Sequence, residues 1–396
     1  MNRCVRTLAV LLSTLLIATA SAAPAKQAQR QFTAGTLNVM TQNLYVGGDI
    51  LLPIAAPPDQ FPAAAALVIE QIIATNFPER AKTLAQQMLA RRPDLIGLQE
   101  VFVVKVCPKG FPEIYCVINQ DYLEILLDEL NANGTKYRVA SSIKNIDLQG
   151  LEVAVDDQLT LLVTLTDRDV ILARSDVQTH DEVSANYAAR LPVPTLPGFS
   201  VIRGWTMVDA VVAGREIRFL NTHLEVSGAG SAEEPVFRAL QFAQAMELVA
   251  DDGPLGGDQH VQVVVGDFNS DPSEGPLVTC GLPDGNGGLQ TFECATPYAV
   301  LAGARFVDTW LERGGPWSIG YTCCQATLLD NPEPSLEERI DHVFMRPAPD
   351  HFGGPYVRGV RAEVVGDEVA DRTPVSGLWP SDHAGVATSM VLRVPR

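Results

Sequence analysis

Polar and ionisable residues recur at the ends of short apolar runs along this chain. The runs with their polar ends cover residues 39–43, 95–100, 219–223, 263–269 and 339–344, and a sixth polar group at 381–383 precedes a strand-like run. Each apolar run is typical of a buried strand. Polar groups at a buried strand end are costly unless they bind something, so we expect them to converge on one cleft.

Glu100, Asp267 and Asn269 could supply the oxygen atoms of such a cleft. Glu100 follows the run 95–98, and Mg²⁺ prefers one or two carboxylates together with water and substrate phosphate. The alternative for Glu100 is a helix-capping or surface role. Asp267 and Asn269 are separated by one residue and point the same way on an extended chain. They could hold a water for attack on phosphorus, or form only an Asx turn before Pro272.

His383 and His223 are candidate imidazoles for the same cleft. Imidazole is the natural acid or base near neutral pH, and a carboxylate on its far nitrogen would fix its tautomer. Asp341 can orient His383 in this way, although Ser-Asp-His is also compatible with a plain polar turn. His223 could equally be a structural histidine. His342 faces the opposite side of its strand, so we expect it to pack in the core.

The ordered set of motifs resembles the endonuclease/exonuclease/phosphatase superfamily, which includes deoxyribonuclease I, abasic-site endonucleases, neutral sphingomyelinases and inositol polyphosphate 5-phosphatases. The matching motifs are Thr41-Gln42-Asn43, Leu98-Gln99-Glu100-Val101, Asn221-Thr222-His223-Leu224, Gly266-Asp267-Phe268-Asn269-Ser270, Arg339-Ile340-Asp341-His342-Val343-Phe344 and Ser381-Asp382-His383-Ala384. They follow the family's order and cover nearly all of the chain after its first residues. Gly-Asp-Phe-Asn together with Ser-Asp-His is the most specific part.

The resemblance implies an α/β fold, a four-layer α/β/β/α sandwich of two packed, mainly antiparallel sheets with outer helices. It also implies that Asn43, Glu100 and Asp382 surround a divalent metal. The expected metal is Mg²⁺, with Mn²⁺ or Ca²⁺ as alternatives.

The resemblance further implies the catalytic roles. Asp267 and Asn269 would position and activate the attacking water and hold the phosphate. His383, oriented by Asp341, and His223 would transfer protons and stabilise charge on the phosphoryl oxygens. One departure from the better-known members is that histidine follows Asp341, where tyrosine is frequent.

The arrangement of elements agrees with this scaffold. A helix followed by a strand occurs twice. The first helix is expected at 63–88, interrupted at Pro78, with its strand at 95–101. The second helix is expected at 234–249, with its strand at 261–265. Many strands and few helices in two similar halves indicate two packed sheets with helices outside. Another helix is expected at 122–130. The other expected strands are 36–44, 160–165, 170–173, 206–212, 217–221, 339–345 and 384–392.

Residues 1–22 are predicted to be a signal peptide. Arg3 and Arg6 precede an uncharged apolar run over 8–20, and Ala20-Ser21-Ala22 fits signal peptidase. The run is shorter than the ~20 residues that span a bilayer, although an uncleaved amphipathic anchor is the alternative. We therefore expect a secreted or periplasmic protein with a flexible N-terminus over 23–35 and one domain over 36–396.

The chain is acidic, with 47 acidic and 29 basic residues and a formal net charge of −18. Such a surface repels nucleic acid, because binding depends on Lys and Arg neutralising phosphates. The expected function is a phosphodiesterase or phosphatase acting on a small or lipid-linked phosphoester, sphingomyelinase-like or inositol-phosphatase-like. A lipid substrate would add a membrane surface as a partner. The alternatives are a secreted non-specific endonuclease and a non-catalytic binding module.

Six cysteines remain after residues 1–22. Cys107 with Cys116 and Cys280 with Cys294 would each close a short loop, but the sequence does not choose among the possible pairings. The adjacent pair Cys323-Cys324 favours a disulfide or buried thiols over zinc, because it lacks the usual ligand spacing. This pair and the proline-rich stretch 191–197 match no family motif, so we expect them to shape the substrate pocket.

Overall fold

The computed structural model describes residues 32–132, 134–156, 158–193, 198–257, 260–316, 318–347 and 357–395. The predicted signal peptide, residues 23–31 and residues 194–197 of the proline-rich stretch lie outside this part of the chain. Residues 32–35, predicted to be flexible, instead begin strand β1 (Phe32–Asn43) and pair with residues 392–395. These four residues form a strand because they pair with a segment from the other end of the sequence.

The larger sheet contains eight strands and carries the first of the two predicted halves. In spatial order they are β17 (Val357–Val365), β18 (Gly385–Pro395), β1, β2 (Leu95–Gln99), β6 (Thr160–Arg174), β3 (Val103–Pro108) and β4 (Ile118–Asp121), with β5 (Tyr137–Ala154) paired to β6. β1 and β2 are parallel, and the other pairings in this sheet are antiparallel.

The smaller sheet carries the second half. Its order is β15 (Val307–Asp308), β16 (Asp341–Arg346), β12 (Val261–Asp267), β11 (Arg215–His223), β10 (Gly204–Val212) and β7 (Gln178–Asn186). Two short pairs lie outside it: β8 (Leu191–Pro192) with β9 (Ser200–Val201), and β13 (Leu277–Pro283) with β14 (Leu289–Ala295).

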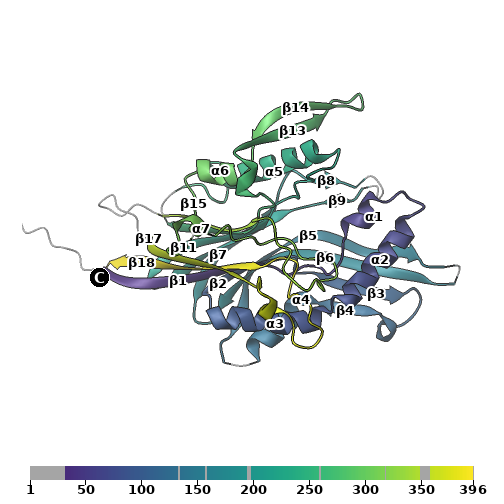
Figure 1. The fold of residues 1–396 in the computed structure, drawn as a ribbon, viewed down its shortest axis with the longest axis horizontal. Coiled ribbons are helices and arrows are strands. Elements are labelled where there is room, and N and C mark those ends of the chain that lie inside the picture. Colours follow the sequence, from purple (N-terminus) through teal and green to yellow (C-terminus); the bar gives the residue numbers. More distant parts are fainter. Residues whose placement is uncertain are drawn as a thin grey trace, which may run out of the picture.

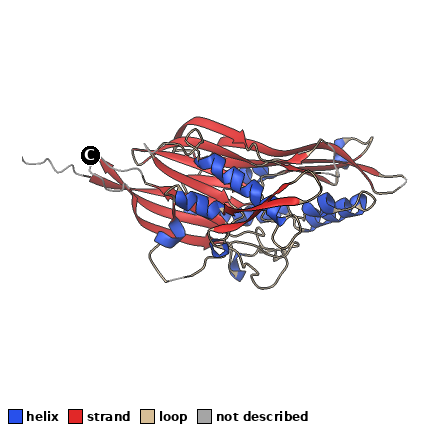
Figure 2. Ribbon diagram, turned by 90° about the horizontal axis from the view of Figure 1, so that it is seen from above, coloured by secondary structure: helices blue, strands red, loops and turns tan. Residues whose placement is uncertain are grey.

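Helices cover the outer face of each sheet (Figures 1 and 2). Those on the larger sheet are α2 (Phe61–Ala74), α3 (Phe77–Arg91) and α4 (Tyr122–Asn131), and those on the smaller sheet are α5 (Glu234–Val249) and α6 (Pro297–Gly303). The short elements are α1 (Leu51–Ala55), α7 (Thr309–Glu312), η1 (Glu113–Tyr115), η2 (Pro272–Glu274) and η3 (Val369–Asp371). The predicted four-layer α/β/β/α sandwich is therefore confirmed.

Strand alternation explains the layers. On β12, Val263 and Val265 join the core between the two sheets, whereas Val264 joins the core under α5 and α6. Successive side chains of a strand point to opposite faces, so a strand buried on both faces is apolar throughout. Gly97 lies where the two sheets are in close contact, because an added Cβ would collide with Val265 and Asn221.

Two helical crossovers set the position of the site. The chain passes from β1 through α2 and α3 to the parallel strand β2, and from β11 through α5 to the parallel strand β12. Parallel neighbours need such crossovers, and their carboxyl ends meet at the same edge. The interruption predicted at Pro78 occurs between α2 and α3, and Pro78 itself lies in the first turn of α3, where its missing N–H is tolerated.

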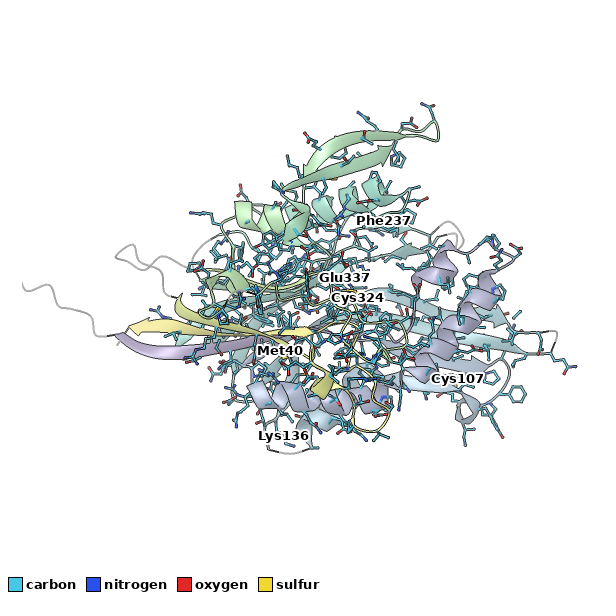
Figure 3. The ribbon with its side chains drawn as sticks, viewed as in Figure 1. Met40, Cys107, Lys136, Phe237, Cys324 and Glu337 are labelled. Carbon is cyan, nitrogen blue, oxygen red and sulfur yellow. A yellow bond between two sulfur atoms is a disulfide. The ribbon has the colours of Figure 1, made fainter. Side chains whose placement is uncertain are left out.

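Three disulfides lie in the described part of the chain: Cys107–Cys116, Cys280–Cys294 and Cys323–Cys324 (Figure 3). The first closes the connection between β3 and β4, and the second joins β13 to β14. Among the described residues no single helix is long and apolar enough to cross a membrane. α2 and α3 pass that test only as a pair, with a bend of 50° between them.

Candidate active site

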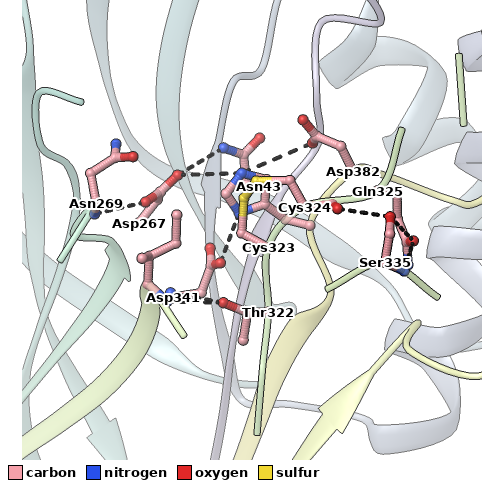
Figure 4. Close-up of a disulfide and its surroundings, with 12 residues drawn as sticks. Asn43, Asp267, Asn269, Thr322, Cys323, Cys324, Gln325, Ser335, Asp341 and Asp382 are labelled. Carbon is pink, nitrogen blue, oxygen red and sulfur yellow. Dashed lines mark hydrogen bonds and ion pairs between the residues drawn. A yellow bond between two sulfur atoms is a disulfide. The ribbon is translucent and has the colours of Figure 1, made fainter. Parts of the chain in front are cut away.

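The predicted site residues lie together at one edge of the two sheets. Figure 4 shows five of them: Asn43, Asp267, Asn269, Asp341 and Asp382. Three of the predicted residues lie side by side on neighbouring strands. Asp267 of β12 is paired in register with His223 of β11 on one side and with Asp341 of β16 on the other. The other predicted residues end or flank strands at this edge: Asn43, Glu100, Asn269, Asp382 and His383. The strand ends therefore converge as the sequence predicts.

His383 and Asp341 form a buried pair. Nδ1 of His383 lies 2.8 Å from Oδ2 of Asp341, while Nε2 lies 3.8 Å from Oδ2 of Asp267. Burial disfavours the charged ring, but the carboxylates of Asp341, Asp382 and Asp267 outweigh it and raise the pKa of His383 well above its usual range. Oδ1 of Asp341 is buried without a hydrogen-bond partner among the described residues. This arrangement can hold a protonated imidazole in one orientation.

Asp267 lies at the centre of the group. Its carboxylate accepts hydrogen bonds from Nδ2 of Asn43 at 3.1 Å and from the backbone N–H of Asn269 at 2.9 Å. Burial, reinforced by Asp341 and opposed by His383, raises the pKa of Asp267 to about 7. The hydrogen bond from Asn269 forms an Asx turn. The sequence presented this turn and a position of Asp267 in the cleft as alternatives, but both occur.

His223 lies beside an arginine that sequence reasoning missed. Nη1 of Arg203 is 3.0 Å from Nδ1 of His223, and both side chains are buried. Burial and then the guanidinium lower the pKa of His223 well below its usual range, so this ring is neutral. Nε2 of His223 lies 3.4 Å from Oδ2 of Asp267. A signal was present, because Arg203 directly precedes a strand at this edge and His383 lies two residues before another.

Asn43, Glu100 and Asp382 form the predicted metal group. Nδ2 of Asn43 donates to Oε1 of Glu100 at 3.1 Å, and Oδ1 of Asn43 accepts from the backbone of Tyr45. Burial, opposed by the charge of His383 and reinforced by Glu100, raises the pKa of Asp382 to about 7.

The donor set of this group fits a hard divalent cation, because it consists of two carboxylates and an amide. Asp382 also lies 4.0 Å from Nε2 of His383. In this arrangement the amide of Asn43 links Glu100 to Asp267. It would present its oxygen to a cation only after rotating. The ligand atoms of Asp267, Asp341 and His383 also lie within 4.8 Å of one another.

A second acidic pair, also missed from the sequence, lies on β6. Asp167 and Asp169 are fully buried, and Nδ2 of Asn145 donates to Asp169 at 2.9 Å. Burial raises the pKa of Asp167 to about 6, and burial with the charge of Asp167 raises that of Asp169 well above its usual range. The sequence could have indicated this pair, because the two acids stand at alternate positions next to apolar runs.

His342 packs in the core, as predicted. Its ring is 1% exposed, contacts the rings of Phe268, Tyr298 and Phe344, and lies within 3.0 Å of both Arg339 Nη1 and the carbonyl oxygen of Ser270.

Comparison with known proteins agrees with this fold. Residues 163–383 match the sequence model of the Endonuclease/Exonuclease/phosphatase family. A solved family member from Bacteroides thetaiotaomicron is similar to 91% of this chain over 97% of its own, with 16% identity and a TM-score of 0.50. A mannosyl-6-phosphatase from the same organism is similar to 90% of this chain over 100% of its own, with 16% identity and a TM-score of 0.50. No curated protein matches the sequence.

Proposed function

Because the chain belongs to the endonuclease/exonuclease/phosphatase family, we propose that it is an exported, divalent-metal-dependent phosphoester hydrolase. The family's members are phosphoester hydrolases. The observation that carries the proposal is the buried His383–Asp341 pair beside Asp267. Phosphoester hydrolysis needs a positioned nucleophile, an acid near the leaving oxygen and a way to stabilise negative charge.

Glu100 and Asp382, with Asn43, would hold Mg²⁺, or Mn²⁺ or Ca²⁺ in its place. The bound cation would supply electrostatic stabilisation of the negative charge that grows on the phosphoryl oxygens. Glu100 is fixed for this role by the backbone N–H of Val46, which donates to Oε2 at 3.0 Å.

The remaining residues divide the proton transfers between them. Asp267, with a pKa raised to about 7, is ionised in part near neutral pH and accepts the proton of the attacking water. Asn269 orients that water and the phosphate. His383 is charged and donates its proton to the leaving oxygen, while neutral His223 and charged Arg203 stabilise the phosphoryl oxygens.

An exposed apolar loop favours a lipid-linked phosphoester over nucleic acid. Between β3 and β4, Phe111 is 62% exposed, Ile114 86% and Tyr115 60%. Exposed apolar clusters mark surfaces that bind membranes or partners. β3 begins close to Glu100 and is about 20 Å long, so the strand connects the metal group to this loop. The acidic net charge of −18 also disfavours a polyanion.

An apolar pocket is lined in part by β3, the strand that leads to this loop. Its volume is about 90 Å³, and every lining side chain is apolar, including Ile69 of α2, Val104 of β3 and Leu148 of β5. An apolar pocket of this kind suits a hydrocarbon group rather than a sugar or a base.

The substrate is tested by offering the purified protein bis-p-nitrophenyl phosphate, plasmid DNA, sphingomyelin vesicles and inositol phosphates, each with Mg²⁺ or EDTA. We expect metal-dependent hydrolysis of the small diester and of the lipid. Cleavage of DNA alone would establish the nuclease alternative. Activity that persists in EDTA would remove the metal mechanism, and no hydrolysis of any substrate would favour the binding module.

The apolar loop has its own matched test. Ile114→Ser and Tyr115→Ser should each lower hydrolysis of sphingomyelin in vesicles by about tenfold, roughly the loss expected for one apolar anchor, and leave bis-p-nitrophenyl phosphate hydrolysis unchanged. Val375→Ser is the control, because Val375 is 87% exposed and lies away from the loop. Equal effects of the three changes on vesicles would remove the lipid argument.

Export is the part of the proposal that rests on residues 1–22. Cleavage after Ala22 would leave Ala23 as the first residue of the exported protein. N-terminal sequencing of the protein recovered outside the cytoplasm checks this. An intact Met1 in that fraction would contradict it.

A further inference from the structure

The Cys323–Cys324 pair lies within the active site rather than on a distant loop. Figure 4 shows it among Asn43, Asp341 and Asp382. The carbonyl oxygen of Thr322 accepts from the backbone of Ala384 at 2.8 Å, and the backbone N–H of Gln325 donates to the carbonyl oxygen of Asp382 at 2.9 Å. The cysteines are therefore held against the segment that carries Asp382 and His383.

Side-chain contacts of the same segment extend to the other catalytic strand. Oγ1 of Thr322 accepts hydrogen bonds from the backbone N–H groups of Ile340 and Asp341, each at 3.1 Å. The backbone N–H of Cys323 donates to the carbonyl oxygen of Glu338 at 2.9 Å. The position of the two sulfur atoms relative to His383 and Asp341 is thus fixed by contacts on both sides.

The sulfur atoms of Cys323 and Cys324 and a ring nitrogen of His383 lie within 4.8 Å of one another. Cys323 is buried and Cys324 is exposed. Two thiolates and an imidazole are a ligand set that soft and borderline cations such as Zn²⁺ prefer. The set differs from the carboxylates and amide of the proposed Mg²⁺ group, so the two groups select different metals.

A structural role does not explain this disulfide. Cys107–Cys116 and Cys280–Cys294 join residues 9 and 14 positions apart, whereas Cys323 and Cys324 are neighbours. A disulfide stabilises mainly by closing a loop in the unfolded chain, and a bond between neighbours closes almost none. Its location beside His383 therefore calls for a functional account.

We propose that Cys323–Cys324 is a reducible pair whose dithiol form, together with His383, binds Zn²⁺ and stops hydrolysis. The inhibitory part rests on the proposed function, because it requires His383 to act in catalysis. Asp341, bonded to one ring nitrogen, would orient the imidazole for the metal as it does for proton transfer.

The chemistry needs a dithiol reductant. One thiolate of the reductant attacks the sulfur of exposed Cys324, and Cys323 leaves as a thiolate. The second thiol of the reductant then displaces Cys324 and closes a cyclic disulfide, so two electrons and two protons pass to the pair. Binding of Zn²⁺ releases those two protons, because the ligands are thiolates.

The test uses the full mature protein, reduced and freed of reductant without air, with Cd²⁺ as a spectroscopic probe and Zn²⁺ as the inhibitor. Reduced wild type should show the ultraviolet charge-transfer band of cadmium–thiolate bonds, saturating at a single ion per chain. Zn²⁺ should inhibit bis-p-nitrophenyl phosphate hydrolysis at a concentration roughly tenfold or more below that needed for the oxidised protein.

Cys324→Ser is the matched variant. Cys324 is exposed, so the fold should persist, and a thermal unfolding curve verifies it. The variant keeps the other two disulfides and the Mg²⁺ group, yet it should lose the saturating band and the extra sensitivity to Zn²⁺.

No band in the reduced wild type, or an equal band in Cys324→Ser, would overturn the metal site. If Zn²⁺ inhibits the oxidised and the reduced protein equally, the reduced pair is not the inhibitory site. If the wild type hydrolyses nothing, the proposed function fails, while the cadmium band still decides the metal site.

Discussion

His383 and His342 are buried imidazoles next to the same strand residue, Asp341, yet their surroundings make the first charged and the second neutral. His383 faces Asp341, Asp382 and Asp267, which raise its pKa well above the usual range against the effect of burial. Around His342, burial and the guanidinium of Arg339 lower the pKa to about 4. The sign of the neighbouring charge, rather than the residue type, separates the imidazole suited to catalysis from the one suited to packing.

Strand geometry creates this difference. Asp341 and His342 are successive residues of β16, so their side chains point to opposite faces. Asp341 points toward His383, whereas His342 points into the aromatic core beside Phe268 and Phe344. One strand thereby supports a charged site on one face and a neutral core on the other.

Replacing the charged imidazole should have the largest effect. His383→Ala should lower kcat/KM for bis-p-nitrophenyl phosphate by about 10³-fold, the usual contribution of a positioned acid or base. The melting temperature should also fall, because the buried carboxylate of Asp341 loses its partner. Kinetics and thermal unfolding of the same preparation check both points. An unchanged kcat/KM per folded molecule would remove His383 from the reaction.

Removing the carboxylate next to the two imidazoles should have the next largest effect. Asp341→Asn should lower kcat/KM by about 10²-fold, because the imidazole loses its orientation and its opposite charge. His383 must be protonated to act as an acid, so activity falls as pH rises through its pKa. Without Asp341 that pKa falls, and the alkaline limb of the pH–rate profile should move to lower pH. An alkaline limb at the same pH in the variant and the wild type would contradict the role of Asp341 in holding the charged imidazole.

The neutral imidazole should control stability instead. The pKa of His342 is lowered from 6.5 to about 4 on folding. A depressed pKa gives stability that is present above the unfolded value and is lost as pH falls toward the folded value, about 3 kcal/mol in total. Urea unfolding across this pH interval measures the loss. His342→Gln should flatten the dependence, and an equally steep curve in the variant would assign the loss to other groups.

The smallest effect concerns the other neutral imidazole, His223. Arg203→Gln removes the guanidinium that helps to keep the pKa of this ring low. We expect kcat/KM to fall by about tenfold, or ~1.4 kcal/mol, with Arg203→Lys restoring part of the loss. If Arg203→Gln unfolds the protein and Arg203→Lys is fully active, the guanidinium is structural only.

Much of the scaffold was readable from local patterns. The helix at 234–249 has the predicted bounds, and the polar residues at the ends of apolar runs identified the edge of the sheets. β5 was missed because most of its residues are polar or half-exposed, so it lacks the apolar signal of a buried strand. Its partner β6 supplies the hydrogen bonds that define it.

The details of the site depend on contacts between distant segments. Asp341 could be proposed as the partner of His383, but the place of Arg203 beside His223 follows from the pairing of β10 with β11. The position of Cys323–Cys324 follows from its contacts with residues 338 and 382–384. No local spacing rule encodes these contacts.

The central claim is that the strand-end residues hydrolyse a phosphoester with the help of a divalent cation held by Glu100 and Asp382. The direct test is bis-p-nitrophenyl phosphate hydrolysis by wild type and Glu100→Gln while Mg²⁺ is varied from EDTA-treated to saturating. The account predicts no activity in EDTA, full recovery of the wild type with Mg²⁺, and a variant that needs far more Mg²⁺ or stays inactive. Equal activity of wild type in EDTA and in Mg²⁺ would contradict it.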